Sequence, residues 1–117
     1  MPLVTVEDIR PPDLGLLGPL LEGVAVAVAD ALGRPRESVW ARFVVVEAAR
    51  FGGASSEAIS HPVVTIATGA LPDSVVERTL RAAAEAAALA LGRHPEDVWV
   101  RFDTLRPGSV LTNGMLQ

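Results

Sequence analysis

Cysteine is absent from this chain of 117 residues. Its absence excludes disulfide bonds and metal sites that use thiolate ligands. Aromatic residues make up only 4% of the chain, the formal net charge is −4, and no basic run occurs. Surfaces that bind nucleic acid normally carry clustered basic side chains, often with aromatic side chains that stack on bases. We therefore expect no nucleic-acid partner.

Membrane segments and zinc sites are not indicated either. No apolar run reaches the roughly 18 residues of a membrane helix, and the nearest, residues 80–91, contains Arg81 and Glu85. The N-terminus lacks the basic start and apolar block of a secretory signal. The two histidines are too few, without cysteine, for an ordinary structural zinc site. The sequence predicts a cytoplasmic protein that has no membrane contact and uses no metal or organic cofactor.

Hydrophobic residues, in contrast, make up 50% of the chain, and the mean hydropathy is +0.36. We interpret residues 1–117 as a single domain, which is long enough to bury a core. The hydrophobic content is high for a small monomer, and extensive exposed apolar surface commonly marks contacts between subunits. The composition therefore favours an oligomer.

The sequence contains an internal repeat. ALGRPRESVWARF at residues 31–43 and ALGRHPEDVWVRF at residues 90–102 share Ala, Leu, Gly, Arg, Glu, Val, Trp, Arg and Phe at matching positions. PLVTV at residues 2–6 is likewise matched by PVVTI at residues 62–66. Both of these shorter runs are apolar and β-branched, which is typical of strands. The two halves of the chain are therefore expected to fold alike.

Each half has the pattern of a strand, a helix and a second strand. The predicted elements are a strand from residue 2, a helix over 16–32 and a strand over 39–46, and then a strand from residue 62, a helix over 75–91 and a strand over 98–105. Both helices end at a Leu-Gly pair, where Gly33 and Gly92 are expected to be left-handed. Asp73 or Ser74 is the expected N-cap of the second helix.

The chain therefore divides into two β-α-β repeats. Repeat 1 covers residues 1–47, a linker covers 48–60, repeat 2 covers 61–105 and a C-terminal tail covers 106–117. Two strands joined by a helical crossover are normally parallel. The expected fold is α/β (α+β), with a four-stranded sheet and both helices on one face. The alternate residues that face the other side are also apolar, so we expect sheets from several subunits to pack together.

Four stretches carry a resemblance to a known family. They are Met1-Pro2 before the first strand, Gly33-Arg34-Pro35 after the first helix, FGGASSE at residues 51–57 and PEDVWVRF at residues 95–102. In order and spacing the chain resembles the tautomerase superfamily, the group of 4-oxalocrotonate tautomerase and macrophage migration inhibitory factor. That family forms homotrimers of duplicated β-α-β subunits. Its active sites lie between neighbouring subunits and use the amino-terminal proline as the catalytic base.

The resemblance also implies a set of residues that bind the substrate. Arg34 stands where the family has a substrate-binding lysine, and Thr68 where it has an isoleucine beside the proline. Trp99 and Arg101 stand where it has a pocket tyrosine and a pocket asparagine, which reach toward the proline of a neighbouring subunit. Val110 keeps the valine of the family's tail. An arginine carries a permanent charge and a fork that matches a carboxylate.

The implied pocket departs from the family type. Ser38 stands where another pocket tyrosine would be, and Thr112 replaces an aromatic wall. A pocket that is less aromatic and more cationic favours a smaller or doubly anionic 2-oxo acid over an aryl substrate.

The Trp-x-Arg pair has an alternative interpretation. Trp40-Ala41-Arg42 in the first half repeats Trp99-Val100-Arg101. Such a pair can simply pack an interface between subunits, and we interpret Arg42 as structural. His61 and His94 stand at element boundaries and are predicted to be exposed.

The two prolines that open the repeats differ in chemistry. A proline at a chain terminus is a secondary amine with a lone pair, whereas a proline within a chain has an amide nitrogen. Pro2 becomes a base if Met1 is removed, and Pro62 never does. An α-amino group titrates near pKa ~8, and burial or a nearby cation favours its neutral form.

The sequence therefore predicts a keto–enol tautomerase, an isomerase that acts on a small 2-oxo acid without a cofactor. Pro2 is the predicted general base, and Arg34, Thr68, Trp99, Arg101 and Val110 are the predicted substrate-binding residues. The alternative is a trimer of the same fold that has lost its activity and serves as a binding or structural protein. Retention of Met1 would favour that alternative, because Pro2 would then be acylated.

Overall fold

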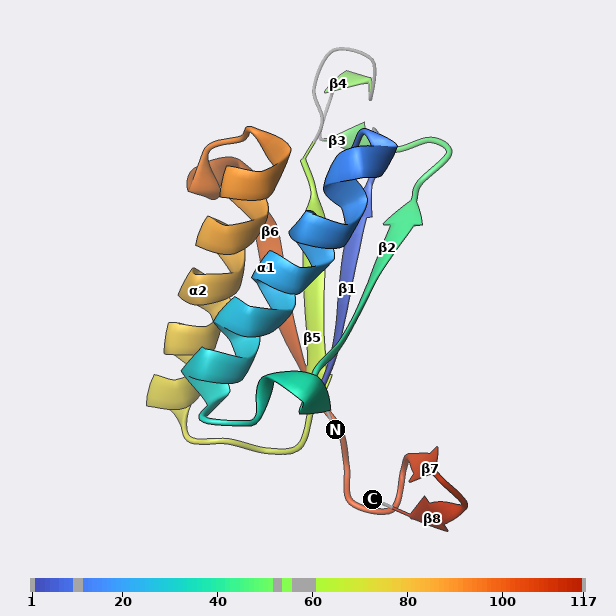
Figure 1. Ribbon diagram of the computed structural model, residues 1–117, viewed down its shortest axis with the longest axis vertical. Helices are drawn as coiled ribbons and strands as arrows, with labels where there is room; N and C mark the ends of the chain where they lie inside the picture. Colours follow the sequence, from blue (N-terminus) through green and yellow to red (C-terminus); the bar gives the residue numbers. More distant parts are fainter. Residues whose placement is uncertain (1, 10–11, 52–53, 56–60, 117) are drawn as a thin grey trace.

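The computed structural model describes residues 2–9, 12–51, 54–55 and 61–116. Two helices lie side by side on one face of a four-stranded sheet (Figure 1). The helices are α1 (Leu14–Leu32) and α2 (Asp73–Leu91), and the sheet strands are β1 (Leu3–Asp8), β2 (Trp40–Val45), β5 (Val63–Thr68) and β6 (Trp99–Thr104). This arrangement confirms the predicted fold class.

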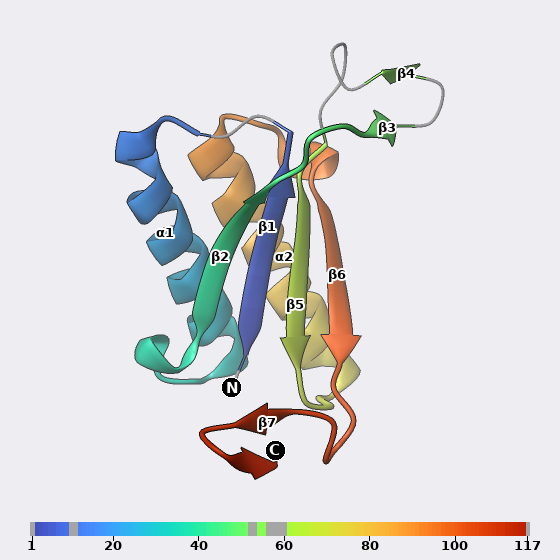
Figure 2. The same ribbon diagram turned by 90° about the vertical axis from the view of Figure 1, so that its right-hand side faces the viewer.

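The sheet has the strand order β2-β1-β5-β6. Strands β1 and β2 are parallel, as are β5 and β6, and each pair is the product of one repeat. Strands β1 and β5 pair in antiparallel orientation at the centre of the sheet and join the repeats. The N-terminal end of β1 therefore lies at the same edge as the C-terminal ends of β5 and β6 (Figure 2).

Equivalent hydrogen bonds recur in the two repeats. The N–H of Trp40 donates to the carbonyl of Pro2, and the N–H of Trp99 donates to the carbonyl of Pro62, both at 2.9 Å. At the other end of each strand pair, the N–H of Val46 donates to Asp8 at 2.9 Å, and that of Leu105 to Thr68 at 2.7 Å. The duplication seen in the sequence is thus a duplication of backbone geometry.

The core lies between the helices and the sheet. Strand residues alternate between the two sheet faces, so Val4, Val6, Val64 and Ile66 point toward the helices and are fully buried. They meet Leu20, Val24 and Val28 of α1 and Ala83, Ala87 and Ala88 of α2. The small alanine side chains allow α2 to approach the sheet and α1 closely.

The predicted C-terminal ends of both helices are confirmed, whereas the predicted N-cap of the second helix is not. Gly33 and Gly92 follow the helices with φ values of 68° and 67°, in the left-handed region, as predicted. The predicted N-cap of the second helix was wrong, because Pro72 occupies that position and no side chain caps the helix by a hydrogen bond. Asp73 lies instead in the first turn, where a carboxylate interacts favourably with the helix dipole.

Two short hairpins lie outside the four-stranded sheet. Within the predicted linker, β3 (Arg50–Phe51) pairs with β4 (Ala54–Ser55). In the tail, β7 (Leu111–Thr112) pairs with β8 (Met115–Leu116) around Asn113 and Gly114, which have φ values of 52° and 74°. Asn-Gly is a favoured pair for such a two-residue turn. Residues 52–53 and 56–60, much of the FGGASSE segment, lie outside the described residues.

Helix α1 qualifies the prediction about membrane segments. It is long and apolar enough, by length and composition, to cross a membrane. The prediction that no apolar run is long enough was therefore wrong for residues 14–32, in which Glu22 and Asp30 are the charged residues. Its buried residues, Leu20, Val24 and Val28 among them, pack against the sheet. One such helix is weak evidence for a membrane span, since a core helix has the same length and composition.

No described segment of the chain covers the sheet face opposite the helices (Figure 2). Trp40 and Trp99 lie on it and are 58% and 71% exposed. The expectation of an apolar face is only partly right, because a polar row crosses all four strands. Arg42, Thr5, Thr65 and Arg101 lie in direct register along that row.

Truncation of a core residue should destabilise this fold strongly. We expect Ile66→Ala to lower the free energy of unfolding by about 2–5 kcal/mol, because a cavity forms in a packed core. Leu89→Ala, at a position that is 87% exposed, should change it by roughly 0.5 kcal/mol or less. Urea unfolding of the two variants measures the difference. Equal losses would contradict the assignment of the core.

Candidate functional site

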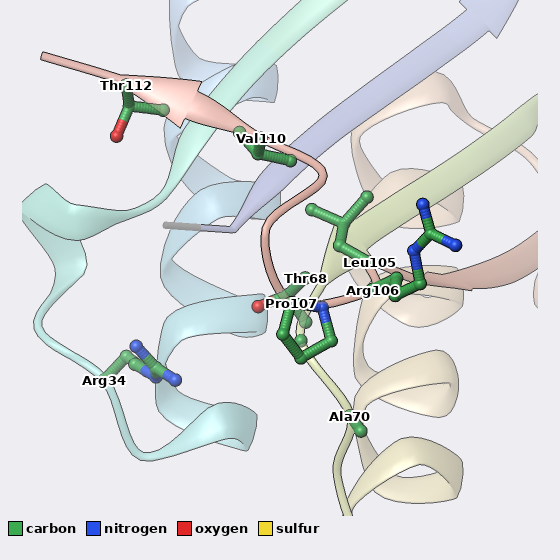
Figure 3. A pocket seen from close by; sticks show the side chains of 9 residues that line it. Arg34, Thr68, Ala70, Leu105, Arg106, Pro107, Val110 and Thr112 are labelled. Carbon is green, nitrogen blue, oxygen red and sulfur yellow. The ribbon is translucent and has the colours of Figure 1, made fainter. Parts of the chain in front are cut away.

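A cleft lies at the sheet edge where β1 begins and β5 ends. Its volume is about 310 Å³. The lining residues come from the loop after α1, the end of β5 and the tail: Arg34, Thr68, Gly69, Ala70, Leu105, Arg106, Pro107, Val110 and Thr112 (Figure 3). Three of the predicted substrate-binding residues, Arg34, Thr68 and Val110, are therefore brought together in one chain.

Arg34 supplies the cleft with a cation. The left-handed Gly33 ends α1, and the N–H of Arg34 then donates to the carbonyl of Ala29 at 2.9 Å, which fixes the start of the loop. Among the described residues, none forms a hydrogen bond or ion pair with the Arg34 guanidinium. The nearby Arg36 is paired with Asp30 at 3.2 Å. The Arg34 charge thus remains available to a ligand in the cleft (Figure 3).

Thr68 forms the floor of the cleft as the last residue of β5. The side chain is on the helix-facing side of the strand, and the residue is only 3% exposed. Figure 3 shows its hydroxyl oxygen on the side that faces Arg34. The hydroxyl can both donate and accept a hydrogen bond, which suits a carboxylate or a carbonyl oxygen.

Pro2 lies beside this cleft but does not line it. Leu3 pairs with Ala67 in the antiparallel β1–β5 register, and one step further along that register Pro2 stands opposite Thr68. The side chain of Pro2 is fully buried. Within one chain, the predicted base is therefore the cross-strand neighbour of a cleft residue, and the cleft does not open onto it.

Trp99 lies at the opposite end of the sheet, and Arg101 lies near the middle of β6. Trp99 pairs with Val63 and Arg101 with Thr65, toward the N-terminal end of β5, whereas Thr68 is at its C-terminal end. Both side chains are exposed on the uncovered sheet face. They do not join the Pro2 cleft of their own chain. That they reach the proline of a neighbouring subunit stays a prediction.

The two arginines of the polar row have different partners. Arg101 donates two hydrogen bonds to Oδ1 of Asp103, at 2.8 and 3.2 Å, and a third to Oδ2 at 2.9 Å. These hydrogen bonds, with the charge of the Asp103 carboxylate, raise the pKa of the Arg101 guanidinium above its ordinary value. Its repeat counterpart Arg42 donates to the hydroxyl of Thr5 at 3.0 Å. Arg42 thus contacts a strand residue of its own chain.

Sequence reasoning missed part of the cleft wall. Leu105, Arg106 and Pro107 line it, and none of them is among the predicted site residues. The signal was the Arg-Pro-Gly-Ser run, which forms a turn with Gly108 at φ 78° and the N–H of Ser109 donating to the carbonyl of Arg106. Figure 3 shows the Arg106 guanidinium directed away from Arg34.

The histidines are placed differently from one another. His94 is exposed, as predicted, but His61 is half-buried, with Nδ1 3.0 Å from the carbonyl oxygen of Asp97. In the described part of the chain, no group of three or more histidine, aspartate or glutamate side chains is arranged to hold a metal ion.

Comparison with known proteins identifies the fold. No family model matches the chain, and no curated protein matches it. Solved structures do match over nearly the whole length. They are tautomerase-fold proteins, so the chain has the fold of the tautomerase superfamily, as the resemblance implied.

Three of these structures can be named. The macrophage migration inhibitory factor of Toxoplasma gondii is 21% identical, with a TM-score of 0.79 over 98% of this chain and 99% of that chain. A wild-type fused 4-OT, described as a symmetric trimer, is 21% identical, with a TM-score of 0.84 over 97% of this chain and 94% of that one. Pt0534 inactivated by 2-oxo-3-pentynoate is 16% identical, with a TM-score of 0.84 over 96% of this chain and 92% of that one. Identities this low establish a shared fold only.

A small carboxylate should bind in the cleft through Arg34. We expect Arg34→Ala to weaken the binding of pyruvate about tenfold or more, because a hydrogen bond to a charged group contributes roughly 1.5–3 kcal/mol. Arg36→Ala is the matched control, since that guanidinium is already paired with Asp30. Titrations followed by the amide signals of the protein measure both affinities. An equal loss in the two variants would contradict the role of Arg34.

Proposed function

We propose that the protein is a cofactor-independent keto–enol tautomerase of a small 2-oxo acid. The observation that carries this proposal is the position of Pro2. The antiparallel register sets the N-terminal proline opposite Thr68, and Thr68 shares its cleft with the cation of Arg34. A base and an anchor for a carboxylate therefore stand at the same edge of the sheet.

The reaction needs few groups. After removal of Met1, the neutral amine of Pro2 takes a proton from an enol oxygen, or from the carbon beside a ketone, and returns it to the other position. Arg34 holds the substrate carboxylate, and the hydroxyl of Thr68 orients it. A base with a pKa near the working pH suits such a proton transfer, and burial among apolar groups lowers the pKa of an amine.

Two observations support the proposed substrate class: the positive charge in the cleft and the description of one structure of the same fold. Within the described residues, the guanidinium of Arg34 has no partner and no aromatic side chain lines the cleft, whose tail side is formed by Val110 and Thr112. One structure of the same fold is described as inactivated by 2-oxo-3-pentynoate, a 2-oxo acid. These two points favour a small 2-oxo acid over an aryl substrate.

The complete site would require a second subunit. Trp99 lies at the far end of the sheet from Pro2 of its own chain, and Arg101 lies in mid-strand. Neither lines the cleft of its own chain, so we infer that both serve the cleft of a neighbour. The uncovered sheet face exposes two tryptophans, and a fused 4-OT of the same fold is described as a symmetric trimer. We propose a homotrimer with sites between subunits.

One observation favours the alternative of an inactive trimer that binds a partner or serves a structural role. Pro2 is fully buried, and the cleft of the single chain is not lined by it. If Met1 is retained, the nitrogen of Pro2 is an amide and cannot accept a proton. The state of the N-terminus therefore decides between the two functions.

The amine can be tested directly. We expect protein with a free Pro2 to convert an enol 2-oxo acid to its keto form, and protein with a tag before Pro2 to lose that activity, because an amide is not a base. The rate should rise with pH through the pKa of the amine and then level off, since the neutral form is the base. Intact mass identifies the N-terminus, and ultraviolet absorbance follows the enol.

The repeat supplies the control for this test. Pro62→Ala changes a proline that occupies the same strand position but has an amide nitrogen, so it should affect only stability. Pro2→Ala leaves a primary amine in place and should retain a small part of the rate. If the tagged protein is as fast as the processed one, Pro2 is not the base.

Assembly can be tested separately. We expect light scattering in dilute solution to give about three times the chain mass of 12.3 kDa, because closed symmetric assemblies are the usual form of soluble oligomers. A monomer would contradict both the homotrimer and a site completed by a neighbour.

A further inference from the structure

The second repeat contains a structural counterpart of the Arg34 cleft at the other end of the sheet. Arg93 follows the left-handed Gly92 as Arg34 follows Gly33, and its N–H donates to Ala88 as that of Arg34 donates to Ala29, both at 2.9 Å. Asp8 ends β1 as Thr68 ends β5, and each accepts a backbone hydrogen bond from the strand beside it. Arg93 with Asp8 therefore corresponds to Arg34 with Thr68.

The same correspondence extends to the cavities. A smaller cleft, with a volume of about 160 Å³ against about 310 Å³, lies at the Asp8 end. Its lining residues Asp8, Ile9 and Val46 are the counterparts of Thr68, Gly69 and Leu105 in the larger cleft, but Arg93, unlike Arg34, is not among the lining residues. The chain therefore has two related clefts, one at each end of the β1–β5 pair.

Arg93 and Arg34 differ in their interaction partners. Nη2 of Arg93 lies 3.2 Å from Oδ2 of Asp8, and the side chains are 18% and 1% exposed. Oδ1 of Asp8 accepts a further hydrogen bond from the N–H of Ile9 at 2.8 Å. In the larger cleft a threonine hydroxyl stands at this place, and no described residue pairs with Arg34. Arg93 is thus paired with a carboxylate of its own chain, whereas no described carboxylate is paired with Arg34.

This pair is unlike the other ion pairs between described residues. The side chains of Arg36–Asp30, Arg81–Glu77 and Arg101–Asp103 are 42% to 73% exposed. Burial of a charge is costly unless it is paired and hydrogen-bonded. Asp8 meets both conditions, which indicates a site shaped to hold one carboxylate.

We propose that the Asp8 carboxylate occupies the second cleft in the place that the carboxylate of the substrate takes against Arg34 in the first. The chain then holds two copies of one anion site, one open and one closed by its own side chain. The proposal rests on the proposed function for the identity of the ligand in the first cleft.

The closed site should accept a free carboxylate once Asp8 is truncated. We expect Asp8→Ala to lower the melting temperature, and sodium formate to restore it by several degrees relative to sodium chloride at the same ionic strength, because a ligand that binds the folded state stabilises it. Asp30→Ala is the matched control, since it also removes the carboxylate partner of an arginine, but at an exposed pair. Formate should stabilise Asp8→Ala more than it stabilises that control or the unchanged protein, because all three share the open Arg34 cleft and only Asp8→Ala gains a second site.

The Arg34 cleft should no longer bind a free carboxylate when residue 68 itself carries one. We expect Thr68→Asp to abolish the binding of pyruvate at the Arg34 cleft, while Thr68→Asn, of the same shape but uncharged, should retain most of it. Amide signals of Arg34 and Gly69 report on this cleft, and those of Ile9 and Arg93 report on the other. In the double variant Asp8→Thr with Thr68→Asp, pyruvate should shift the signals of Ile9 and Arg93 instead.

The outcomes separate this inference from the proposed function. If pyruvate binds at Arg34 but formate stabilises Asp8→Ala no more than it stabilises the unchanged protein, the inference is overturned and the function stands. If formate stabilises Asp8→Ala specifically and Thr68→Asp closes the first cleft, the inference holds even when no tautomerase activity is found. Equal pyruvate binding by Thr68→Asp and Thr68→Asn would overturn the equivalence of the two clefts.

Discussion

The antiparallel pairing of β1 with β5 is the constraint on which the rest of the structure depends. It joins two parallel strand pairs head to tail, so each edge of the sheet receives the start of one repeat's first strand and the end of the other's. Pro2 thereby comes to stand beside Thr68, a residue 66 positions away along the chain by the shared register. The Arg34 loop and the tail then close around this edge. A site built from four distant segments follows from one strand pairing.

The two repeats have similar backbone geometry, but a few side chains give them different chemistry. The nitrogen of Pro62 is always an amide, whereas that of Pro2 depends on the fate of Met1. Asp8 pairs with Arg93, whereas its counterpart Thr68 leaves Arg34 without an internal carboxylate. The larger cleft is found at the end that carries Pro2 and Thr68. All of these differences favour ligand binding at the same end.

The uncovered sheet face combines apolar and charged features. Trp40 and Trp99 are exposed there, and Arg42 and Arg101 lie in one row with two threonines between them. Arg42 donates a hydrogen bond to the hydroxyl of Thr5, and the charge of Arg101 is paired with Asp103. Covering Arg101 with another subunit costs less in desolvation, because that charge is paired beforehand. The face therefore suits assembly, which the composition had indicated.

The sequence by itself determined the repeated elements, their order and the glycines that end the helices, because periodicity and turn chemistry act over a few residues. The resemblance also predicted the fold and three residues of the cleft. Tertiary structure decided what depends on distant partners. The pairing of Asp8 with Arg93 spans 85 positions, and no local pattern distinguishes that aspartate from an exposed one. Trp99 and Arg101 are likewise separated from Pro2 because β1 and β5 run in opposite directions. These two strands begin 60 residues apart in the sequence, and their relative direction cannot be read from either segment alone.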